Sequence, residues 1–325
     1  METTISVVQK LADGRFHSGS DLGRSLGISR AAVWKSIQKI KQEWRLSVHA
    51  VPGKGYRLAD PLQLLDSEII LAQLAENSHS RLDNLKIVWS TDSTNRLALE
   101  LVPLRTGHVV AVLAEHQSAG RGRRGRRWES PFGHNLYLSL AGQFGMDLSN
   151  LPGLSLVVAL AVLRTLHRCD AQGIGLKWPN DVLWENRKLC GVLLEMQGES
   201  AGPWQVVMGI GLNLVMEEHA GKKIDRPWVD LRTVLGHDPA RNWLAGKLLD
   251  ELIGMVEEFQ QQGLAPFLSE WRSHDVTRNQ PVVLQFAEGS VRGIARGIDR
   301  QGALLLETDG VVRAYHAGEV RLRYG

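Results

Sequence analysis

Arginine and glycine alternate in one short segment whose composition suits anion binding. Gly120 to Trp128 contains five arginines and three glycines and follows an apolar run, Val109 to Ala114. Glycine lets the backbone approach a ligand closely, and the planar guanidinium of arginine holds carboxylate or phosphate oxygens with two hydrogen bonds. The segment therefore predicts an anion site, although arginines alone would equally suit nucleic acid or a solvated loop.

Two further motifs place a carboxylate near another cation. Lys177-Trp178-Pro179-Asn180-Asp181 is followed by Arg187-Lys188-Leu189-Cys190-Gly191, which puts Asp181 and Lys188 within one expected hairpin. Taken alone, the first motif is also consistent with an edge strand that runs into a turn. Combined with the arginine loop, the two motifs indicate a site that activates a substrate with a nucleotide.

Common nucleotide motifs do not explain this site. The arginine loop formally matches GxGxxG, but no acidic residue follows at the spacing that a dinucleotide-binding βαβ unit requires, and the chain has no Walker-A sequence.

Composition indicates a multidomain globular protein. The chain has 325 residues, of which 43% are hydrophobic and 22% charged, so we expect two or three domains and no extensive disorder. No run approaches the roughly twenty apolar residues that cross a bilayer, and no signal peptide is evident at the start, so we expect no membrane association. Two cysteines form neither a disulfide framework nor a metal motif, which favours a cytoplasmic location.

The positive charge is concentrated at the N-terminus. Residues 1–60 carry ten basic and five acidic side chains, whereas the net charge of the whole chain is only +3. A basic module joined to a nearly neutral body is typical of nucleic-acid binding.

The same region has the pattern of a winged helix-turn-helix. Helical spacing from Ile5 to Ala12 is followed by a second helix from an N-cap at Ser20 to Leu26. A turn at Gly27 precedes a third helix capped by Ser29, and two short runs around Pro52 to Gly55 predict a β-hairpin wing. The expected buried stripe of the third helix is Ala32, Val33, Ile37 and Ile40.

This module is predicted to bind DNA. The groups expected to reach phosphates or base edges are Ser29, Arg30, Lys35, Ser36 and Lys39 on the third helix and Lys54 at the wing tip. A small dimerisation module with a solvated basic face is the alternative. One copy buries little surface, so we expect a dimer on a two-fold operator.

The rest of the chain alternates strand and helix patterns and then becomes purely strand-like. We expect a linker at Ala59 to Pro61, a connecting helix over Leu62 to Leu74, and an α/β domain with a mixed sheet flanked by helices. Short alternating runs from Val282 to Leu322 predict a small β-barrel. The expected strands of the mixed sheet are 87–89, 109–114, 136–140, 175–178, 189–196 and 206–214, with helices over 154–167 and 243–259.

The motifs together resemble those of biotin protein ligases. The resemblance rests on Ser93-Thr94-Asn95, on Gln117 with the arginine loop, and on the two lysine-containing motifs. With the N-terminal module, nearly the whole chain is similar to the bifunctional bacterial members, which also repress the biotin operon. The resemblance implies a winged helix-turn-helix in 1–60, a catalytic domain related to class II aminoacyl-tRNA synthetases in 61–275, and an SH3-like C-terminal domain in 276–325.

The implied chemistry is the activation of a carboxylic acid. An ionised carboxylate resists attack by an amine, so biotin must first form a mixed anhydride with AMP, and cations must bring its carboxylate to the α-phosphorus of ATP. The implied cofactors are ATP and Mg²⁺, with biotin as substrate. The implied partners are the biotin carboxyl carrier protein of acetyl-CoA carboxylase, operator DNA and a second copy of the adenylate-bound chain.

The resemblance also implies roles for individual residues. Lys188, Arg123 and Asp181 are the expected catalytic residues, and Asp181 either acts on the acceptor lysine or holds Mg²⁺. Asn213, Trp228 and Arg323 are expected on the adenine side. The expected biotin and adenylate contacts are Ser93, Thr94, Asn95, Gln117, Arg121, Gly122, Arg123 and Lys188.

Two other functions stay open at this stage. The chain could sense a ligand and bind DNA without turning over, or it could be a ligase for lipoate, which undergoes the same activation. Retention of Asp181, Lys188 and the arginine loop favours an active ligase. Cys190 is expected to be a buried packing residue, and His116 a packing residue rather than a base.

Overall fold

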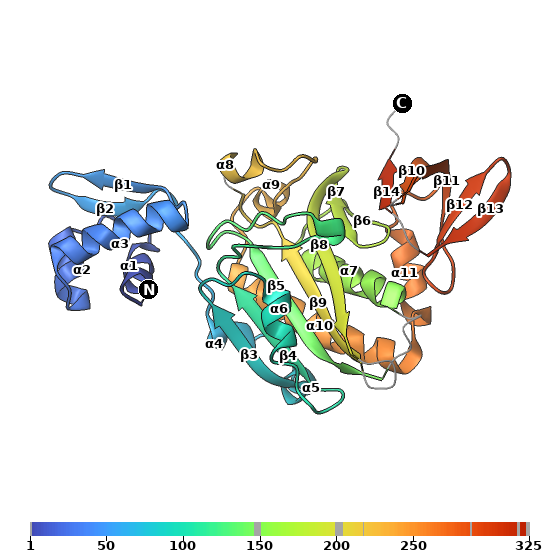
Figure 1. Ribbon diagram of the computed structural model, residues 1–325, viewed down its shortest axis with the longest axis horizontal. Coiled ribbons are helices and arrows are strands. Elements are labelled where there is room, and N and C mark those ends of the chain that lie inside the picture. Colours follow the sequence, from blue (N-terminus) through green and yellow to red (C-terminus); the bar gives the residue numbers. More distant parts are fainter. Residues whose placement is uncertain are drawn as a thin grey trace.

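The described part of the chain forms three sheets with helices around them (Figure 1). The computed structural model describes residues 2–145, 151–198, 204–216, 218–286, 288–316 and 319–322. Arg323, expected on the adenine side, lies outside these residues. Within the described residues, no helix is long and apolar enough to cross a membrane.

The N-terminal region folds as a winged helix. Its elements are α1 (Glu2–Leu11), α2 (Gly19–Leu26), α3 (Arg30–Glu43) and the antiparallel hairpin of β1 (Val48–Val51) and β2 (Gly55–Leu58). Gly27 ends α2 at φ 65°, a left-handed conformation that glycine adopts without a steric penalty. Ser29 caps α3 as expected, accepting a hydrogen bond from the amide of Ala32 at 3.1 Å.

Two expectations for this region are wrong. Ser18, not Ser20, caps α2, because its hydroxyl accepts from the amide of Asp21 and also donates to the Asp21 carboxylate. Ser36 is buried rather than exposed. It belongs with Val33, Ile37 and Ile40 on the face of α3 that packs into the core, so it cannot reach a DNA groove in this conformation.

A seven-stranded mixed sheet forms the centre of the molecule, in the order β3-β4-β5-β9-β8-β7-β6. Strands β3 and β4 are parallel, and every other described neighbour pair is antiparallel. The bounds are β3 Leu82–Val88, β4 Val109–Ala114, β5 Leu136–Phe144, β6 Ile174–Lys177, β7 Asp181–Trp184, β8 Arg187–Gln197 and β9 Trp204–Leu212. All the expected strands are present, and β7 is an additional strand that the sequence pattern did not predict.

Alternate residues of the central strands pack on opposite faces of the sheet. On β4, Ala111 and Leu113 join the large core beneath α7 (Leu151–His167) and α10 (Arg241–Gln262), whereas Val110 and Val112 pack against α6 (Thr94–Leu99). Covering both faces explains why the strand reads as one apolar run. The α6 helix therefore lies on the opposite face from α7 and α10.

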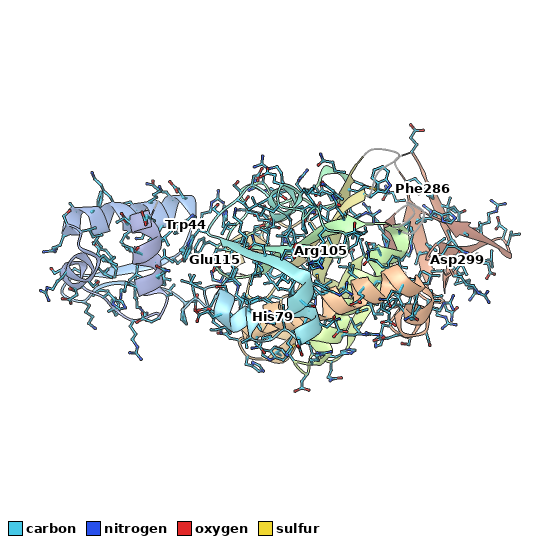
Figure 2. All side chains as sticks on the ribbon, turned by 90° about the horizontal axis from the view of Figure 1, so that it is seen from below. Trp44, His79, Arg105, Glu115, Phe286 and Asp299 are labelled. Atoms are coloured by element: carbon cyan, nitrogen blue, oxygen red, sulfur yellow. The ribbon has the colours of Figure 1, made fainter. Side chains whose placement is uncertain are left out.

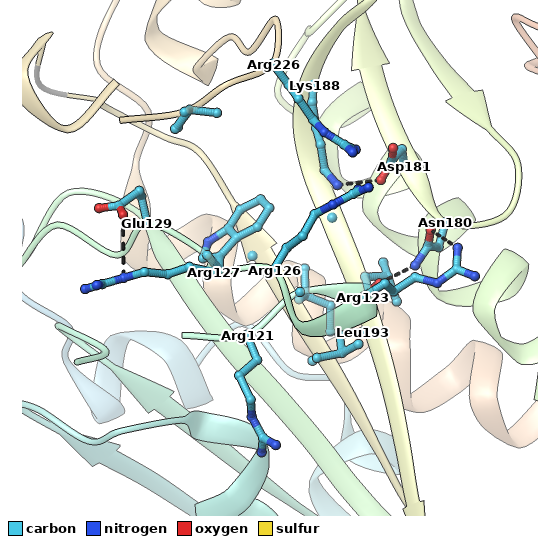
Figure 3. A pocket seen from close by; sticks show the side chains of 18 of the residues that line it. Arg121, Arg123, Arg126, Arg127, Glu129, Asn180, Asp181, Lys188, Leu193 and Arg226 are labelled. Atoms are coloured by element: carbon cyan, nitrogen blue, oxygen red, sulfur yellow. Dashed lines mark hydrogen bonds and ion pairs between the residues drawn. The ribbon is translucent and has the colours of Figure 1, made fainter. Parts of the chain in front are cut away.

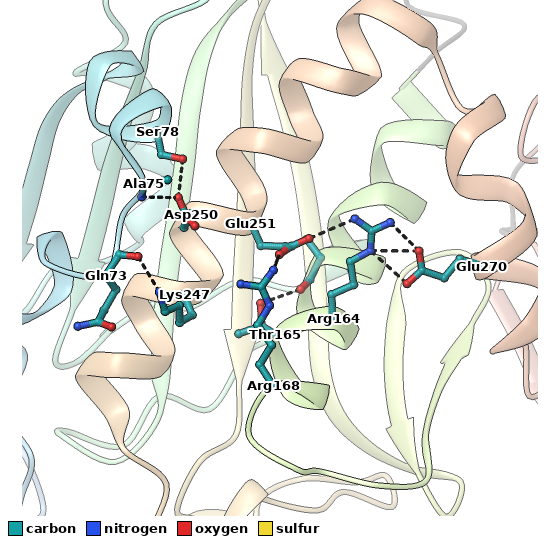
Figure 4. Close-up of polar contacts among 11 residues, drawn as sticks. Gln73, Ala75, Ser78, Arg164, Thr165, Arg168, Lys247, Asp250, Glu251 and Glu270 are labelled. Carbon is teal, nitrogen blue, oxygen red and sulfur yellow. Dashed lines mark hydrogen bonds and ion pairs between the residues drawn. The ribbon is translucent and has the colours of Figure 1, made fainter.

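Ion pairs hold the helical layer together (Figure 4). On α7, Arg164 binds Glu270 at 2.6 Å and Glu251 of α10 at 3.2 Å, and hydrogen bonds to Glu270 raise its pKa further. Asp250 of α10 accepts from the amide of Ala75 at 2.9 Å. The remaining helices are α4 (Ser67–Leu71), α5 (Glu76–Arg81), α8 (Glu218–Gly221), α9 (Leu231–Leu235), α11 (Leu268–Ser273) and 3-10 turns at Arg123–Gly125 and Ala265–Phe267.

The helix that connects the winged helix to the central region is shorter than expected. The α4 helix begins only at Ser67, because Asp66 caps it through the amides of Glu68 and Ile69. The preceding residues are extended instead, where Arg241 donates to the carbonyl of Gln63 at 2.8 Å. That arginine also forms a buried ion pair with Glu115 at 2.6 Å.

An aromatic stack joins the winged helix to the central region. Trp44, which ends α3, stacks on Phe132 with 4.3 Å between ring centroids and 14° between planes. Trp89 stacks on the same ring at 6.2 Å. Phe132 is fully buried and belongs to the hydrophobic core of the winged helix although it lies in the central region. Figure 2 shows Trp44 at this junction.

The C-terminal region is a five-stranded antiparallel sheet in the order β13-β12-β11-β10-β14. Its strands match the pattern expected from the sequence. It docks on the central region through Trp178, whose indole donates to the carbonyl of Gly302 at 3.0 Å. The bounds are β10 Pro281–Gln285, β11 Ser290–Ile298, β12 Leu304–Thr308, β13 Val311–Tyr315 and β14 Glu319–Leu322.

Candidate functional site

A cavity of about 350 Å³ lies where the arginine loop meets β8 and β9 (Figure 3). All three sequence motifs contribute to it, as do the start of α6 and the segment 223–228. The expected ligand residues that line it are Ser93, Thr94, Asn95, Gln117, Arg121, Gly122, Arg123, Asp181, Lys188, Asn213 and Trp228. Segments far apart in the sequence therefore converge on one pocket.

One side of the pocket is a buried network of neutral polar groups. Gln117 accepts from the amide of Thr94 at 2.9 Å and from its hydroxyl at 3.1 Å. The Ser139 hydroxyl on β5 donates to the side-chain carbonyl oxygen of Asn95 at 2.6 Å and lies 2.8 Å from the Thr94 hydroxyl. Ser93 occupies the N-cap position of α6, but its side chain makes no capping hydrogen bond. Hydroxyl and amide groups in such a slot can exchange hydrogen bonds with a polar, uncharged ligand.

The network ends at an acidic residue that the sequence analysis missed. Glu195 on β8 accepts from the Asn95 amide at 2.7 Å and pairs with Arg121 at 3.2 Å. Neither Ser139 nor Glu195 was expected, because each lies on a strand without a local motif. Their partners, Thr94, Asn95 and Arg121, were expected at the site.

The opposite side of the pocket carries the charged pair. Lys188 Nζ lies 2.6 Å from one oxygen of Asp181, and Lys177 Nζ lies 3.0 Å from the other. Burial raises the pKa of the Asp181 carboxyl, but the two lysines outweigh burial and hold that pKa well below its usual range. Asp181 is thus a permanently charged anchor for Lys188.

This geometry does not favour Asp181 as a base for the acceptor lysine or as a Mg²⁺ ligand. A carboxylate with a lowered pKa accepts a proton poorly, so it is a weak general base near neutral pH. Both of its oxygens already bind lysine ammonium groups, which would repel a cation. In this arrangement Asp181 does not fit the expected role of a Mg²⁺ ligand. No group of three or more His, Cys, Asp or Glu side chains that could hold a metal occurs in the described part of the chain.

The arginines of the loop point in different directions (Figure 3). Arg123 donates to the side-chain carbonyl of Asn180 at 3.4 Å, beside Asp181. Figure 3 shows Arg126 turned toward the Lys188–Asp181 pair and Arg121 turned away from it. Arg124 donates to the backbone carbonyl of Gln285 in the C-terminal region at 2.7 Å. Arg126 was not among the expected ligand residues.

Trp128 supplies a buried donor that the sequence analysis left without a role. Its Nε1 atom has no hydrogen-bond partner, although it is buried, and Lys188 Nζ lies 5.5 Å from its ring centroid. An unpaired buried donor is costly, so this N–H is available to an acceptor from outside the protein. The close approach of this ring requires Gly211, because a Cβ at that position would collide with the indole.

Two of the three residues expected on the adenine side, Asn213 and Trp228, line the cavity. The Asn213 amide donates to the carbonyl of Val229 at 3.1 Å, and the Trp228 indole donates to Gly221 at 3.2 Å. Both residues line the cavity, and their polar hydrogens hold the segment 221–229 in place.

Two side chains that were expected to have no chemical role lie in buried or half-buried surroundings. Cys190 is fully buried, which raises the pKa of its thiol well above the usual range. His116 accepts or donates one hydrogen bond with Ser90 at 3.0 Å, and burial lowers its pKa.

A second candidate site lies on the winged helix. Arg30 and Lys35 on α3 and Lys54 in the wing turn are exposed, and Lys39 is half-buried and pairs with Glu43 at 3.7 Å. Ser29 is exposed but its hydroxyl already caps α3. The cations on α3 and in the wing form a positively charged surface suited to a nucleic-acid backbone.

Comparisons with known proteins agree with both sites. Residues 88–213 match the biotin/lipoate A/B protein ligase family, residues 277–323 the biotin protein ligase C terminal domain, and residues 4–57 an HTH domain. The fold and the pocket thus define a protein ligase that also carries a helix-turn-helix domain of the DNA-binding type.

Two similar proteins align with this chain over nearly its whole length. The chain is 43% identical to "Bifunctional ligase/repressor BirA" of Salmonella typhimurium, over 99% of this chain and 98% of that one. It is 42% identical to the protein of the same name from Escherichia coli, over 98% and 97%. The chain belongs to the biotin/lipoate A/B protein ligase family.

A solved structure supports the fold over three quarters of the chain. The biotin protein ligase from Aquifex aeolicus, in complex with biotin and ATP, superimposes with a TM-score of 0.65 at 29% identity. The alignment covers 75% of this chain and 100% of that one.

Proposed function

We propose that the chain activates biotin with ATP as biotinyl-5′-AMP and transfers the biotinyl group to a lysine of the biotin carboxyl carrier protein of acetyl-CoA carboxylase. The observation that carries the proposal is the Lys188–Asp181 pair, which opens onto a pocket rimmed by the arginine loop. The similar proteins named as biotin ligases, and the Aquifex structure with biotin and ATP, support this choice of substrates.

The first step joins two anions. A biotin carboxylate oxygen attacks the α-phosphorus of ATP, a P–O bond forms, and the bond to pyrophosphate breaks. Lys188, fixed by Asp181, and Arg123 provide the positive charge that offsets repulsion and stabilises the developing phosphoryl charge. In the second step, the neutral amine of the acceptor lysine attacks the acyl carbon, a C–N bond forms, the C–O bond to AMP breaks, and the amine proton is released to solvent.

The neutral network is proposed to bind the ureido ring. That ring offers two N–H donors and a carbonyl, and Ser93, Thr94, Asn95 and Gln117 provide matching groups at the buried end of the pocket. Arg121 and Gly122 complete the wall. Trp128 Nε1 is proposed to donate to the adenylate. Asn213, Trp228 and Arg323 are proposed to surround the adenine.

Mg²⁺ is proposed to enter with the phosphates of ATP rather than on an anchor in the protein. Asp181, its expected ligand, is occupied by two lysines. The metal would add positive charge beside the phosphates when bound.

The winged helix is proposed to bind operator DNA of biotin synthesis genes, and the adenylate-bound chain to act there as a homodimer. Support comes from the exposed cations Arg30, Lys35 and Lys54 and from the similar ligase/repressor proteins. We propose a cytoplasmic location, where both the DNA and the carrier protein reside. We also propose that the domains divide as 1–60, 61–275 and 276–325.

Pyrophosphate release tests the ligase function. Purified chain with ATP should release pyrophosphate only when biotin is present, and lipoate should not substitute. A folded protein that shows no biotin-dependent release would be a sensor without turnover, and faster release with lipoate would identify a lipoate ligase. Transfer to a purified carrier domain would then be followed by mass spectrometry.

A further inference from the structure

The exposed face of α3 carries a large aromatic residue to which the DNA-binding proposal gives no role. Trp34 is 54% exposed and is absent from the hydrophobic core of the winged helix. Its neighbours Val33 and Ile37 are buried in that core, so the helix orientation is fixed and Trp34 must face outward. A single exposed apolar side chain is common on protein surfaces, so the case for a partner rests on what surrounds this indole and where it lies on α3.

The surroundings of Trp34 identify the chemistry of that partner. Arg30 lies one helical turn before it, Lys35 follows it, and Lys41 lies two turns further on, all of them exposed. A partner that covers the indole must therefore also accept several positive charges. This combination favours a polyanion with apolar features on its surface over a second apolar protein face.

The position of Trp34 within α3 indicates which part of the DNA it would contact. It is the fifth residue of α3, which begins at Arg30, and α3 follows the Gly27 turn that packs it against α2. In helix-turn-helix modules the N-terminal part of this helix meets base edges in the major groove. There the thymine 5-methyl group is the apolar feature that a hydrophobic side chain can read.

We propose that Trp34 is a specificity-determining residue that reads a thymine methyl group in the operator. The inference rests on the proposed DNA-binding function and adds a base-reading contact to it. Arg30, Lys35 and Lys54 hold the phosphate backbone without regard to sequence, and Trp34 selects which duplex binds tightly.

The test begins with a selection from random duplex DNA. Full-length protein, incubated with biotin and ATP, selects tight-binding duplexes, and each thymine of the selected site is then replaced in turn by deoxyuridine, which lacks only the methyl group. The wild-type chain is expected to lose about fourfold in affinity at one position of each half-site. Trp34→Ala should bind the original duplex more weakly and should not distinguish thymine from deoxyuridine at that position.

Matched variants separate this contact from other effects. Leu104→Ala removes an even more exposed apolar side chain, 88% exposed, far from α3 and should leave affinity and deoxyuridine sensitivity unchanged. Lys41→Ala should weaken binding to all duplexes alike and make the salt dependence shallower. Thermal unfolding of Trp34→Ala checks whether the winged helix stays folded in the variant.

The outcomes distinguish the inference from the function on which it rests. Equal deoxyuridine sensitivity in wild type and Trp34→Ala would overturn the role of Trp34 while leaving DNA binding in place. If the wild-type chain selects no sequence at all, both the DNA-binding function and the role of Trp34 fail. If Trp34→Ala instead changes only the oligomeric state, the indole covers a protein interface and the inference is wrong.

Discussion

Lys188 Nζ binds one oxygen of Asp181 at 2.6 Å, so the position of the principal cation in the pocket depends on this carboxylate. Lys177 binds the other oxygen at 3.0 Å. Because both oxygens of the charged Asp181 bind lysine, we infer that Asp181 acts through Lys188 as a positioning residue. Its substitution should therefore disturb the first half of the reaction.

Asp181→Asn is expected to slow the formation of biotinyl-5′-AMP by about ten- to a hundredfold, because a neutral amide holds Lys188 less firmly. Rapid-quench measurement of adenylate formation checks this, alongside transfer from adenylate supplied ready-made. A fall confined to the transfer step would mean that Asp181 acts on the acceptor lysine instead. The lowered pKa also predicts that Asp181 contributes no titration to the rate of adenylation near neutral pH.

Arg124 links the arginine loop to the C-terminal region through the carbonyl of Gln285. Arg124→Ala removes this exposed charge-assisted hydrogen bond, and we expect the adenylate to dissociate about two- to tenfold faster. Arg168→Ala is the control, because Arg168 is an exposed, ion-paired arginine on the helical layer. If the adenylate dissociates from Arg124→Ala no faster than from the wild-type chain, the hydrogen bond between Arg124 and Gln285 does not help to retain it.

Trp44 and Phe132 share the core between the winged helix and the central region. Trp44→Ala leaves a cavity against a fully buried ring, and we expect a loss of about 3–5 kcal/mol in the free energy of unfolding of the winged helix. Chemical denaturation followed by tryptophan fluorescence measures it, with Trp44→Phe as the milder variant. A loss below about 1 kcal/mol would indicate that the stack is not part of a packed core.

The stack of Trp44 on Phe132 affects how the independence of the winged helix and the central region should be tested. Deleting residues 1–60 would remove Trp44 and expose Phe132 next to the arginine loop. A defect of such a truncated chain in biotin activation would therefore not contradict separate domain functions. Single substitutions on α3 are the cleaner test.

Asp275 predicts a pH-dependent stability. Burial raises the pKa of this carboxyl, although hydrogen bonds from Thr277 lower it in part, and one oxygen has no hydrogen-bond partner. A folded pKa above the unfolded value means that the group favours folding in its protonated form, and this contribution is lost as pH rises through the folded pKa.

Asp275→Asn removes that charge. Relative to wild type, the variant should gain stability as the pH rises from about 4 toward neutrality, and the difference in free energy of unfolding should then level off. Urea denaturation at several pH values measures the difference. A difference that does not change with pH would contradict the account of Asp275.

The sequence predicted the site because its residues lie in short contiguous motifs. Lys188, Asp181 and the arginine loop could be found together, since each motif is local and the hairpin spacing brings two of them close. Ser139 and Glu195 could not be found, because a polar residue on a central strand is recognised only when its partners across the sheet are known. The direction of Arg126 depends on tertiary packing in the same way.

The errors in the N-terminal region have local causes. Ser36 stands three residues after Val33 and four before Ile40, so helical spacing itself places it on the buried stripe. The prediction placed Ser36 on the surface because serine is polar, and it did not use this spacing. Two nearby serines also competed as caps, and the acidic residue three positions after Ser18 identifies the right one.

Single-turnover adenylation by Lys188→Ala tests the central claim most directly. The variant should fold as wild type does, bind biotin, and form biotinyl-5′-AMP at least a hundredfold more slowly, because the cation that Asp181 positions is gone. A rate of adenylate formation equal to that of the wild-type chain would contradict the proposed site.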